Sequence, residues 1–244
     1  NGPYMGFNYL QMIIGGHYTH DILKPPEGLH YEQWFFGDNI GDYKNSLHKM
    51  KLEPKSNATQ TWNSALPVAW HNSSWIGDRS IDFINDNSDN DFFLWISFPD
   101  PHHPFDAPEP WSRLYNPEDI ILPKYRKRDF EIRPWWHKAS INGVPKIKDK
   151  NLRTFREKFS RTPFQNDQCL KEIICNYYSM ISLIDHNVGR IINLVNDLNL
   201  DHETTIIFTS DHGDWLGDHG LLLKGPMHYE GLLRVGFIIK GPNI

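Results

Sequence analysis

The sequence predicts an α/β fold in which a mostly parallel sheet is flanked by helices. Residues 92–98, Phe-Phe-Leu-Trp-Ile-Ser-Phe, form a nearly continuous apolar run, which is typical of a strand buried on both faces. A long helical pattern covers 168–200, and strand patterns follow it at 204–209 and 235–239. Helix, strand, polar loop and strand in this order indicate an α/β sheet.

The helix expected at 168–200 rests on one apolar stripe. Apolar residues from Ile174 to Leu198 recur at steps of three and four, which places them on a single helical face. Cys169 and Cys175 fall on different faces of this helix, so we expect no disulfide between them. A shorter amphipathic helix is expected within 74–85.

Composition narrows the class of protein. The 244 residues are 39% hydrophobic and 14% aromatic, which is enough apolar surface for a packed core. The net charge of −5 provides no positive field to attract nucleic acid. No apolar run approaches the roughly 20 residues that cross a bilayer. We therefore expect no nucleic-acid partner and no membrane span.

Two polar clusters follow predicted strands, where open α/β sheets gather their chemistry. Asp211 and His212 come directly after the strand at 204–209, and Gly213 permits a sharp turn beside them. A carboxylate oxygen and an imidazole nitrogen are able to ligate one divalent cation. The alternative is that Asp211 caps the following segment and His212 lies on the surface.

The other candidates are a lysine and a histidine. Lys224 follows three leucines, so a buried ammonium there would need an anion, whereas an extended side chain would reach solvent. His102 lies in Pro-His-His-Pro-Phe (101–105), where prolines restrict the backbone. A histidine at a strand end is able to bind an anion or donate a proton, and the alternative is a structural role.

Several common site motifs are missing from the sequence. It contains no Gly-x-Gly-x-x-Gly, no Walker loop, no His-Glu-x-x-His and no Gly-x-Ser-x-Gly. Dinucleotide-binding, P-loop, zincin and α/β-hydrolase interpretations therefore have no support from the sequence.

Three segments together resemble the sulfatases of the alkaline phosphatase superfamily. They are the strand that ends in Pro-His-x-Pro-Phe (93–105), the helix segment 178–190, and residues 204–242 with Ser-Asp-His-Gly, Gly-Asp-His-Gly and Lys-Gly-Pro. The resemblance implies an incomplete fold of that family. Residues 1–244 would form the central and C-terminal part of its catalytic domain, with 106–165 as a long loop-rich insertion.

The resemblance also implies roles for the candidate residues. Asp211 and His212 would be ligands of the active-site cation, Lys224 would bind the sulfate, and His102 would contact the sulfate or the leaving oxygen. The family usually holds Ca²⁺. Because imidazole is a less typical ligand for so hard a cation, Mn²⁺ remains an alternative.

The family's nucleophile does not match this sequence. It is a formylglycine made from a Cys or Ser followed by x-Pro-x-Arg, and neither Cys169 nor Cys175 has that context. We expect the nucleophile and the remaining metal ligands to lie upstream, outside these residues, and the chain to be inactive alone.

The resulting hypothesis is a metal-dependent sulfuric ester hydrolase acting on a small-molecule or glycan sulfate ester. The alternatives are a phosphonate monoester or phosphodiester hydrolase of the same superfamily, and a non-catalytic homologue that binds anionic ligands. By resemblance, a periplasmic, secreted or lysosomal location is expected before a cytoplasmic one. The substrate and the oligomeric state are left open.

Overall fold

The chain divides into two compact units, which we describe one at a time. The computed structural model describes residues 6–13, 27–124, 129–135, 137, 148–151, 166–225, 227–242 and 244. Unit 1 comprises Asn1–Lys55, Trp62–Leu114 and Asn176–Leu200, and unit 2 comprises Ser56–Thr61, Tyr115–Cys175 and Asp201–Ile244. The expected single domain over 1–244 stays a prediction, and much of the expected insertion at 106–165 lies outside the described residues.

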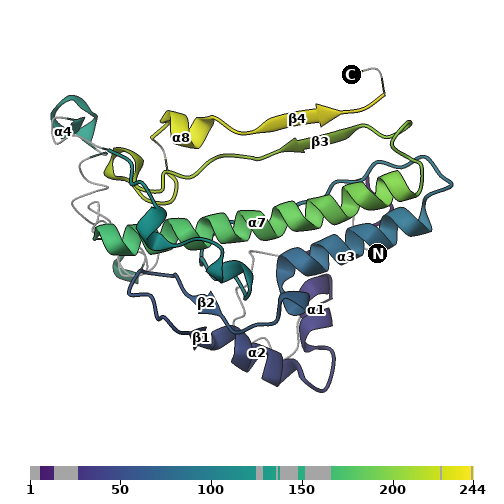
Figure 1. Cartoon of the computed structure of the whole chain (residues 1–244), viewed down its shortest axis with the longest axis horizontal. Helices are drawn as coiled ribbons and strands as arrows, with labels where there is room; N and C mark the ends of the chain where they lie inside the picture. Colours follow the sequence, from purple (N-terminus) through teal and green to yellow (C-terminus); the bar gives the residue numbers. More distant parts are fainter. Residues whose placement is uncertain are drawn as a thin grey trace. The chain divides into compact units, whose positions relative to one another are not determined.

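Helices supply most of the regular structure (Figure 1). The α-helices are α1 (His30–Phe36), α2 (Gly41–Lys49), α3 (Asn72–Asp86), α4 (Asp129–Ile132), α7 (Asp167–Asp197) and α8 (Glu230–Leu233). Short 3-10 helices cover Val68–Trp70, Trp111–Arg113, Pro117–Asp119 and Asp218–Gly220. The two helices expected from hydrophobic periodicity, within 74–85 and 168–200, are confirmed as α3 and α7.

The described strands form two small antiparallel sheets. β1 (Lys51–Leu52) pairs with β2 (Asn63–Ser64), and β3 (Ile206–Thr209) pairs with β4 (Phe237–Lys240). An isolated parallel bridge joins Ser64 to Pro108. The helices and strands agree with an α/β class, but the mostly parallel sheet is not formed among the described residues and stays a prediction.

The apolar run at 92–98 differs from the expected strand. It belongs to no sheet in the described structure, and its side chains alternate between a packed and an exposed side. Phe92, Leu94 and Ile96 pack against the ends of α3 and α7, whereas Phe93 is 76% exposed and Trp95 is 72% exposed. The expectation of burial on both faces is therefore wrong for the described chain, because one face has no covering layer.

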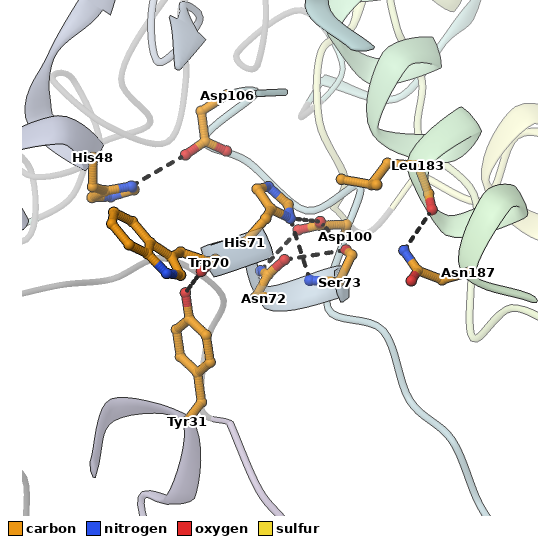
Figure 2. A network of polar contacts seen from close by, with 10 residues as sticks. All are labelled: Tyr31, His48, Trp70, His71, Asn72, Ser73, Asp100, Asp106, Leu183 and Asn187. Carbon is orange, nitrogen blue, oxygen red and sulfur yellow. Dashed lines mark hydrogen bonds and ion pairs between the residues drawn. The ribbon is translucent and has the colours of Figure 1, made fainter. Parts of the chain in front are cut away.

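In unit 1, α3 packs closely against the part of α7 that belongs to this unit. A Cβ atom on Gly77 would collide with Oδ1 of Asn187. Asn187 is fully buried, and its amide nitrogen donates to the carbonyl of Leu183 at 2.8 Å (Figure 2). Further along, Ile84 of α3 packs with Ile191 and Val195 of α7. The absence of a side chain at residue 77 therefore allows the two helices to approach.

An aromatic cluster joins the first helix to the start of α3. Tyr31 and Phe35 of α1 pack with Leu66, Trp75 and Ile76 in one buried core. The hydroxyl of Tyr31 donates to the carbonyl of Trp70 at 2.8 Å, so the polar end of this buried ring has a partner. These contacts give the first turn of α3 a rigid base.

Asp106 is a buried carboxyl group in the same unit. It is 1% exposed, and neither of its oxygens accepts a hydrogen bond within the described part of the chain. Nδ1 of His48 lies 3.9 Å from Oδ2 (Figure 2). Burial raises the pKa of Asp106 well above its usual range, and the nearby Asp100 raises it further.

Unit 2 has a small core beside a strongly apolar ribbon. Trp215, Leu221, Met227 and Leu232 form the core. The β3–β4 ribbon next to it exposes apolar side chains on both strands, including Ile207 at 57% and Phe237 at 65%. In the described chain, this ribbon therefore lacks the covering layers that apolar strands usually have.

Among the described residues, no helix combines the length and the apolar character that a membrane crossing would require.

The contact between α3 and α7 can be tested by adding one methyl group. Gly77→Ala places a Cβ atom against the Asn187 side chain, so we expect a loss of stability of about 1–3 kcal/mol. Gly189→Ala is the matched control, because a Cβ there meets nothing within 4 Å on α7. The control should be neutral or stabilising by about 0.5–1 kcal/mol. Equal unfolding midpoints for the two variants would contradict the packing described.

Asp106→Asn tests the buried carboxyl group through pH. The raised pKa means that the folded state holds the proton more tightly than the unfolded state does. Stability is therefore lost as pH rises above about 4, the pKa of an unfolded aspartate, towards the raised folded value. The asparagine does not titrate, so its stability relative to wild type should increase from pH 4 to pH 7, by about 1 kcal/mol or more. Thermal midpoints at both pH values measure this, with Asp89→Asn on the surface as the control. A pH-independent difference would show the expectation wrong.

Candidate active site

Asp211 and His212 begin the loop that follows β3. The backbone N–H of His212 donates to Oδ1 of Asp211 at 2.8 Å, and the Ser210 hydroxyl donates to the carbonyl of His212 at 2.9 Å. Gly213 comes next and donates its N–H to the carbonyl of Leu232 at 2.8 Å. A Cβ atom at residue 213 would collide with the carbonyl of Gly231, so this close contact with α8 requires glycine. The loop is thus held against α8.

The hydrogen bond of His212 defines which ring nitrogen faces outward. Nδ1 lies 2.7 Å from the carbonyl oxygen of Gly213. A carbonyl oxygen only accepts hydrogen bonds, so Nδ1 carries a proton. In the neutral ring, Nε2 then has the lone pair, which is the arrangement of a metal-binding histidine whose other nitrogen is hydrogen-bonded.

Nε2 of His212 and Oδ2 of Asp211 face each other at 3.6 Å. Both atoms carry lone pairs, and the Asp211 side chain is open to solvent, so a cation is able to reach them. Metal–ligand bonds of about 2.0–2.6 Å are compatible with this separation, so the two residues fit one divalent cation. Within the described chain, no group of three or more His, Cys, Asp or Glu residues gathers, so the pair would supply only part of a coordination shell.

The two residues line an open pocket of about 420 Å³ in unit 2. Lys224 and His228 supply further polar groups, and the remaining lining residues are Gly225, Leu232 and Leu233. The pocket therefore brings together three of the four site residues predicted from sequence, namely Asp211, His212 and Lys224.

Lys224 is partly buried, which was one of the two outcomes left open by the sequence. Burial lowers the pKa of its ammonium, while Asp214 and Asp211 favour the charged form. Asp214 was not predicted as a site residue. Burial raises the pKa of Asp214 to about 6, opposed by the backbone N–H of Leu216 and by Lys224. The lysine thus lies in a field set by two carboxyl groups beside the pocket.

His102 lies in unit 1, on the turn that follows residues 92–98. Its Nδ1 lies 2.6 Å from the carbonyl oxygen of His103, and the two imidazole rings stack with centroids 4.1 Å apart. The carbonyl again requires a proton on Nδ1. The convergence of His102 with the pocket residues stays a prediction.

Neither cysteine is suited to act as the nucleophile. Cys169 and Cys175 are both buried and free, which confirms that they form no disulfide with each other. Burial raises the pKa of Cys175 to about 11 and also raises that of Cys169, and Glu172 adds to both shifts. Since the thiolate is the reactive form, both thiols are inert near neutral pH.

His228 is the pocket residue that sequence reasoning missed. It is exposed and lies four positions after Lys224. One histidine among 13 gave no signal by itself.

Comparison with known proteins places these features in a family. The model of the family described as Sulfatase matches residues 30–244. An arylsulfatase of Clostridium perfringens is 33% identical over 221 residues, which cover 87% of this chain and 40% of that protein. The chain thus spans about two fifths of the length of this relative.

Solved structures agree on the fold. A phosphonate monoester hydrolase from Silicibacter pomeroyi matches with a TM-score of 0.69 at 17% identity, over 89% of this chain and 42% of that chain. A phosphonate monoester hydrolase of Agrobacterium radiobacter matches with a TM-score of 0.67 at 22% identity, over the same shares. The family match extends over most of the sequence and includes the loop of Asp211 and His212, the pocket lysine and the His102 turn. The chain belongs to the sulfatase family.

Proposed function

We propose that the protein is a metal-dependent sulfuric ester hydrolase. The observation that carries this proposal is the pocket in which the facing atoms of Asp211 and His212 lie beside the Lys224 ammonium. A sulfate monoester brings anionic oxygens and leaves behind an alkoxide or phenoxide. Its hydrolysis needs positive charge around the sulfuryl group and a proton for the leaving oxygen.

Asp211 and His212 would hold the divalent cation, Ca²⁺ first and Mn²⁺ as the alternative. A bound cation at that position would draw charge from the sulfuryl oxygens and activate a nucleophile. Lys224 binds the same anionic group from the pocket wall, where its partial burial strengthens the attraction to an anion. Together these residues favour a small anionic ligand over a neutral one.

In this proposal, His102 donates the proton that the leaving oxygen needs. Its Nδ1 is occupied by the His103 carbonyl, so proton exchange takes place at Nε2. A protonated Nε2 would donate to the leaving oxygen as the nucleophile bonds to sulfur and the S–O bond to the leaving group breaks. The ring is then neutral, and it takes up a proton from water before the next cycle.

The nucleophile in this proposal is a formylglycine from a segment outside these residues. The buried, high-pKa thiols of Cys169 and Cys175 support this assignment. The exposed apolar ribbon of β3 and β4 supports a further layer of the fold, and the arylsulfatase relative is longer than this chain. The substrate class is a small-molecule or glycan sulfate ester, and a periplasmic, secreted or lysosomal location is part of the same proposal.

The second candidate is a phosphonate monoester or phosphodiester hydrolase. The structural similarity to two phosphonate monoester hydrolases favours keeping it, although that similarity concerns the fold. Phosphonate and sulfate monoesters are nearly isosteric anions, so the same lysine and cation would serve either.

Substrate preference separates the two candidates. We expect the full-length protein to turn over 4-nitrophenyl sulfate with a higher kcat/KM than 4-nitrophenyl phenylphosphonate. Lys224→Ala should lower kcat on the sulfate by about 100-fold, because it removes a cation that stabilises the transition state. Lys55→Ala, at a lysine side chain that is 67% exposed, is the matched control. A much faster phosphonate reaction would identify the second candidate, and sulfate binding without any turnover would identify a non-catalytic homologue.

Metal binding is tested with two Asp-His pairs from the same chain. Asp211→Asn combined with His212→Ala should lower the affinity of the full-length protein for Ca²⁺ or Mn²⁺ by tenfold or more, as measured by calorimetry and metal analysis. The control is Asp201→Asn combined with His202→Ala, a surface pair whose Oδ2 and Nδ1 atoms lie 3.5 Å apart and which lines no part of the pocket. Equal metal content in both variants would contradict the assigned ligands.

A further inference from the structure

Asp100 is a buried carboxylate two residues before His102. It is 7% exposed and lies at the corner of a tight turn, which the N–H of His102 closes by donating to the carbonyl of Pro99 at 3.1 Å. A buried carboxylate is costly unless hydrogen bonds replace its lost hydration. The partners of Asp100 therefore show what the turn is attached to.

Both oxygens of Asp100 accept hydrogen bonds from the first turn of α3. The Asn72 amide donates to Oδ1 at 3.2 Å, and the Ser73 hydroxyl donates to Oδ2 at 2.5 Å (Figure 2). The donors themselves are fully buried. The attachment thus uses two separate directions, which fixes the carboxylate in rotation as well as in position.

His71 completes the arrangement without supplying a counter-charge. It is the N-cap residue of α3, and its Nδ1 accepts the Ser73 N–H at 3.3 Å. Burial lowers the pKa of His71, although Asp100 opposes that effect. A neutral ring with its lone pair on Nδ1 agrees with the accepted hydrogen bond. The charge of Asp100, 3.7 Å from that nitrogen, is held by hydrogen bonds and by the positive end of the helix dipole.

The first turn of α3 is a rigid support for this attachment. Trp75 and Ile76 anchor it in the aromatic core, and Gly77 lies against the buried Asn187 of α7. A shift of Asp100 would therefore have to break hydrogen bonds or move a packed helix.

The turn also restricts the position of the His102 ring. The ring is hydrogen-bonded to the next carbonyl and stacked on His103, so its position follows the backbone of the turn. We propose that Asp100 is a positioning residue, whose hydrogen bonds to Asn72 and Ser73 set the place from which Nε2 of His102 protonates the leaving oxygen. This inference rests on the proposed function.

The experiment is a double-mutant cycle in the full-length protein. Asp100→Ala removes both attachments and should lower kcat about 10- to 100-fold on an alkyl sulfate, which has a poor leaving group. The loss should be smaller on 4-nitrophenyl sulfate, whose leaving group needs less protonation. In a His102→Ala background, Asp100→Ala should cost less than twofold more, because the two residues act on one step. Equal costs in both backgrounds would overturn the proposal.

Two further variants separate positioning from folding. Asp100→Asn should retain most of the activity, because the Ser73 hydroxyl is able to turn to Oδ1 of Asn72, 3.1 Å away. Ser73→Ala keeps the carboxylate and removes one donor, so it should give a smaller loss with the same dependence on the leaving group. If Asp100→Ala does not fold, Ser73→Ala tests the positioning role of Asp100 instead. Asp89→Ala, at an exposed aspartate, is the control and should change nothing.

A spectroscopic measurement makes the inference independent of turnover. The imidazole NMR signals of His102, assigned with His102→Ala, should shift in Asp100→Ala and stay in place in Asp89→Ala. Unchanged His102 signals would overturn the positioning role even if activity fell. Shifted signals in a protein that hydrolyses no sulfate ester would support the structural link and reject the proposed function instead.

Discussion

The close approach of α3 and α7 at Gly77 is the contact on which the rest of unit 1 depends. It requires an absent side chain on one helix and a buried amide, Asn187, on the other. Because α3 is held there, its first turn has one orientation, and the donors of Asn72 and Ser73 point to one place. The Pro-Asp-Pro turn is attached at that place, and it carries the candidate proton donor. The close packing at Gly77 thus helps to fix the position of His102, the proposed proton donor.

The two candidate histidines make the same local hydrogen bond, although their proposed roles differ. In both His102 and His212, Nδ1 is within hydrogen-bonding distance of the carbonyl of the following residue. That contact holds the ring close to the backbone and places a proton on Nδ1. At residue 212 the outward nitrogen faces a carboxylate, which suits a cation. At residue 102 the proposed partner is a leaving oxygen, which suits a proton. The neutral ring with its proton on Nδ1 suits a metal ligand, whereas a proton donor needs the doubly protonated ring, and the neighbouring group decides between the two forms.

Prediction of helices from sequence succeeded where the signal is local. The three- and four-residue periodicity gave α7, and a shorter pattern gave α3. The Asp-His pair and Lys224 fell into one pocket because the chain between them is short and folds on α8. Sequence patterns could not show which face of residues 92–98 is packed, because neither side of the run is polar. The pairing of β3 with β4 and the partners of Asp100 were equally out of reach. They depend on contacts between segments far apart in the sequence, and composition does not encode such contacts.

The electrostatics of the pocket also follow from burial rather than from motif. Asp214 and Lys224 perturb each other because both are partly removed from water. A sequence shows that an acid and a base are present, whereas the direction of each pKa shift depends on how much solvent surrounds them. The structure shows how far each group is buried. It also shows that His228, which no sequence pattern indicated, lines the pocket.

The burial of Asn72 has a consequence for glycosylation. Asn72-Ser73-Ser74 and Asn57-Ala58-Thr59 both match the acceptor pattern for N-linked glycans. The amide nitrogen that a glycan would modify at residue 72 is the one that donates to Asp100, and the side chain is enclosed by protein. Asn57 is exposed. In a eukaryotic secretory pathway, the folded protein therefore offers its sugar attachment point at residue 57, and a sugar added at residue 72 during synthesis would prevent α3 from closing on the turn.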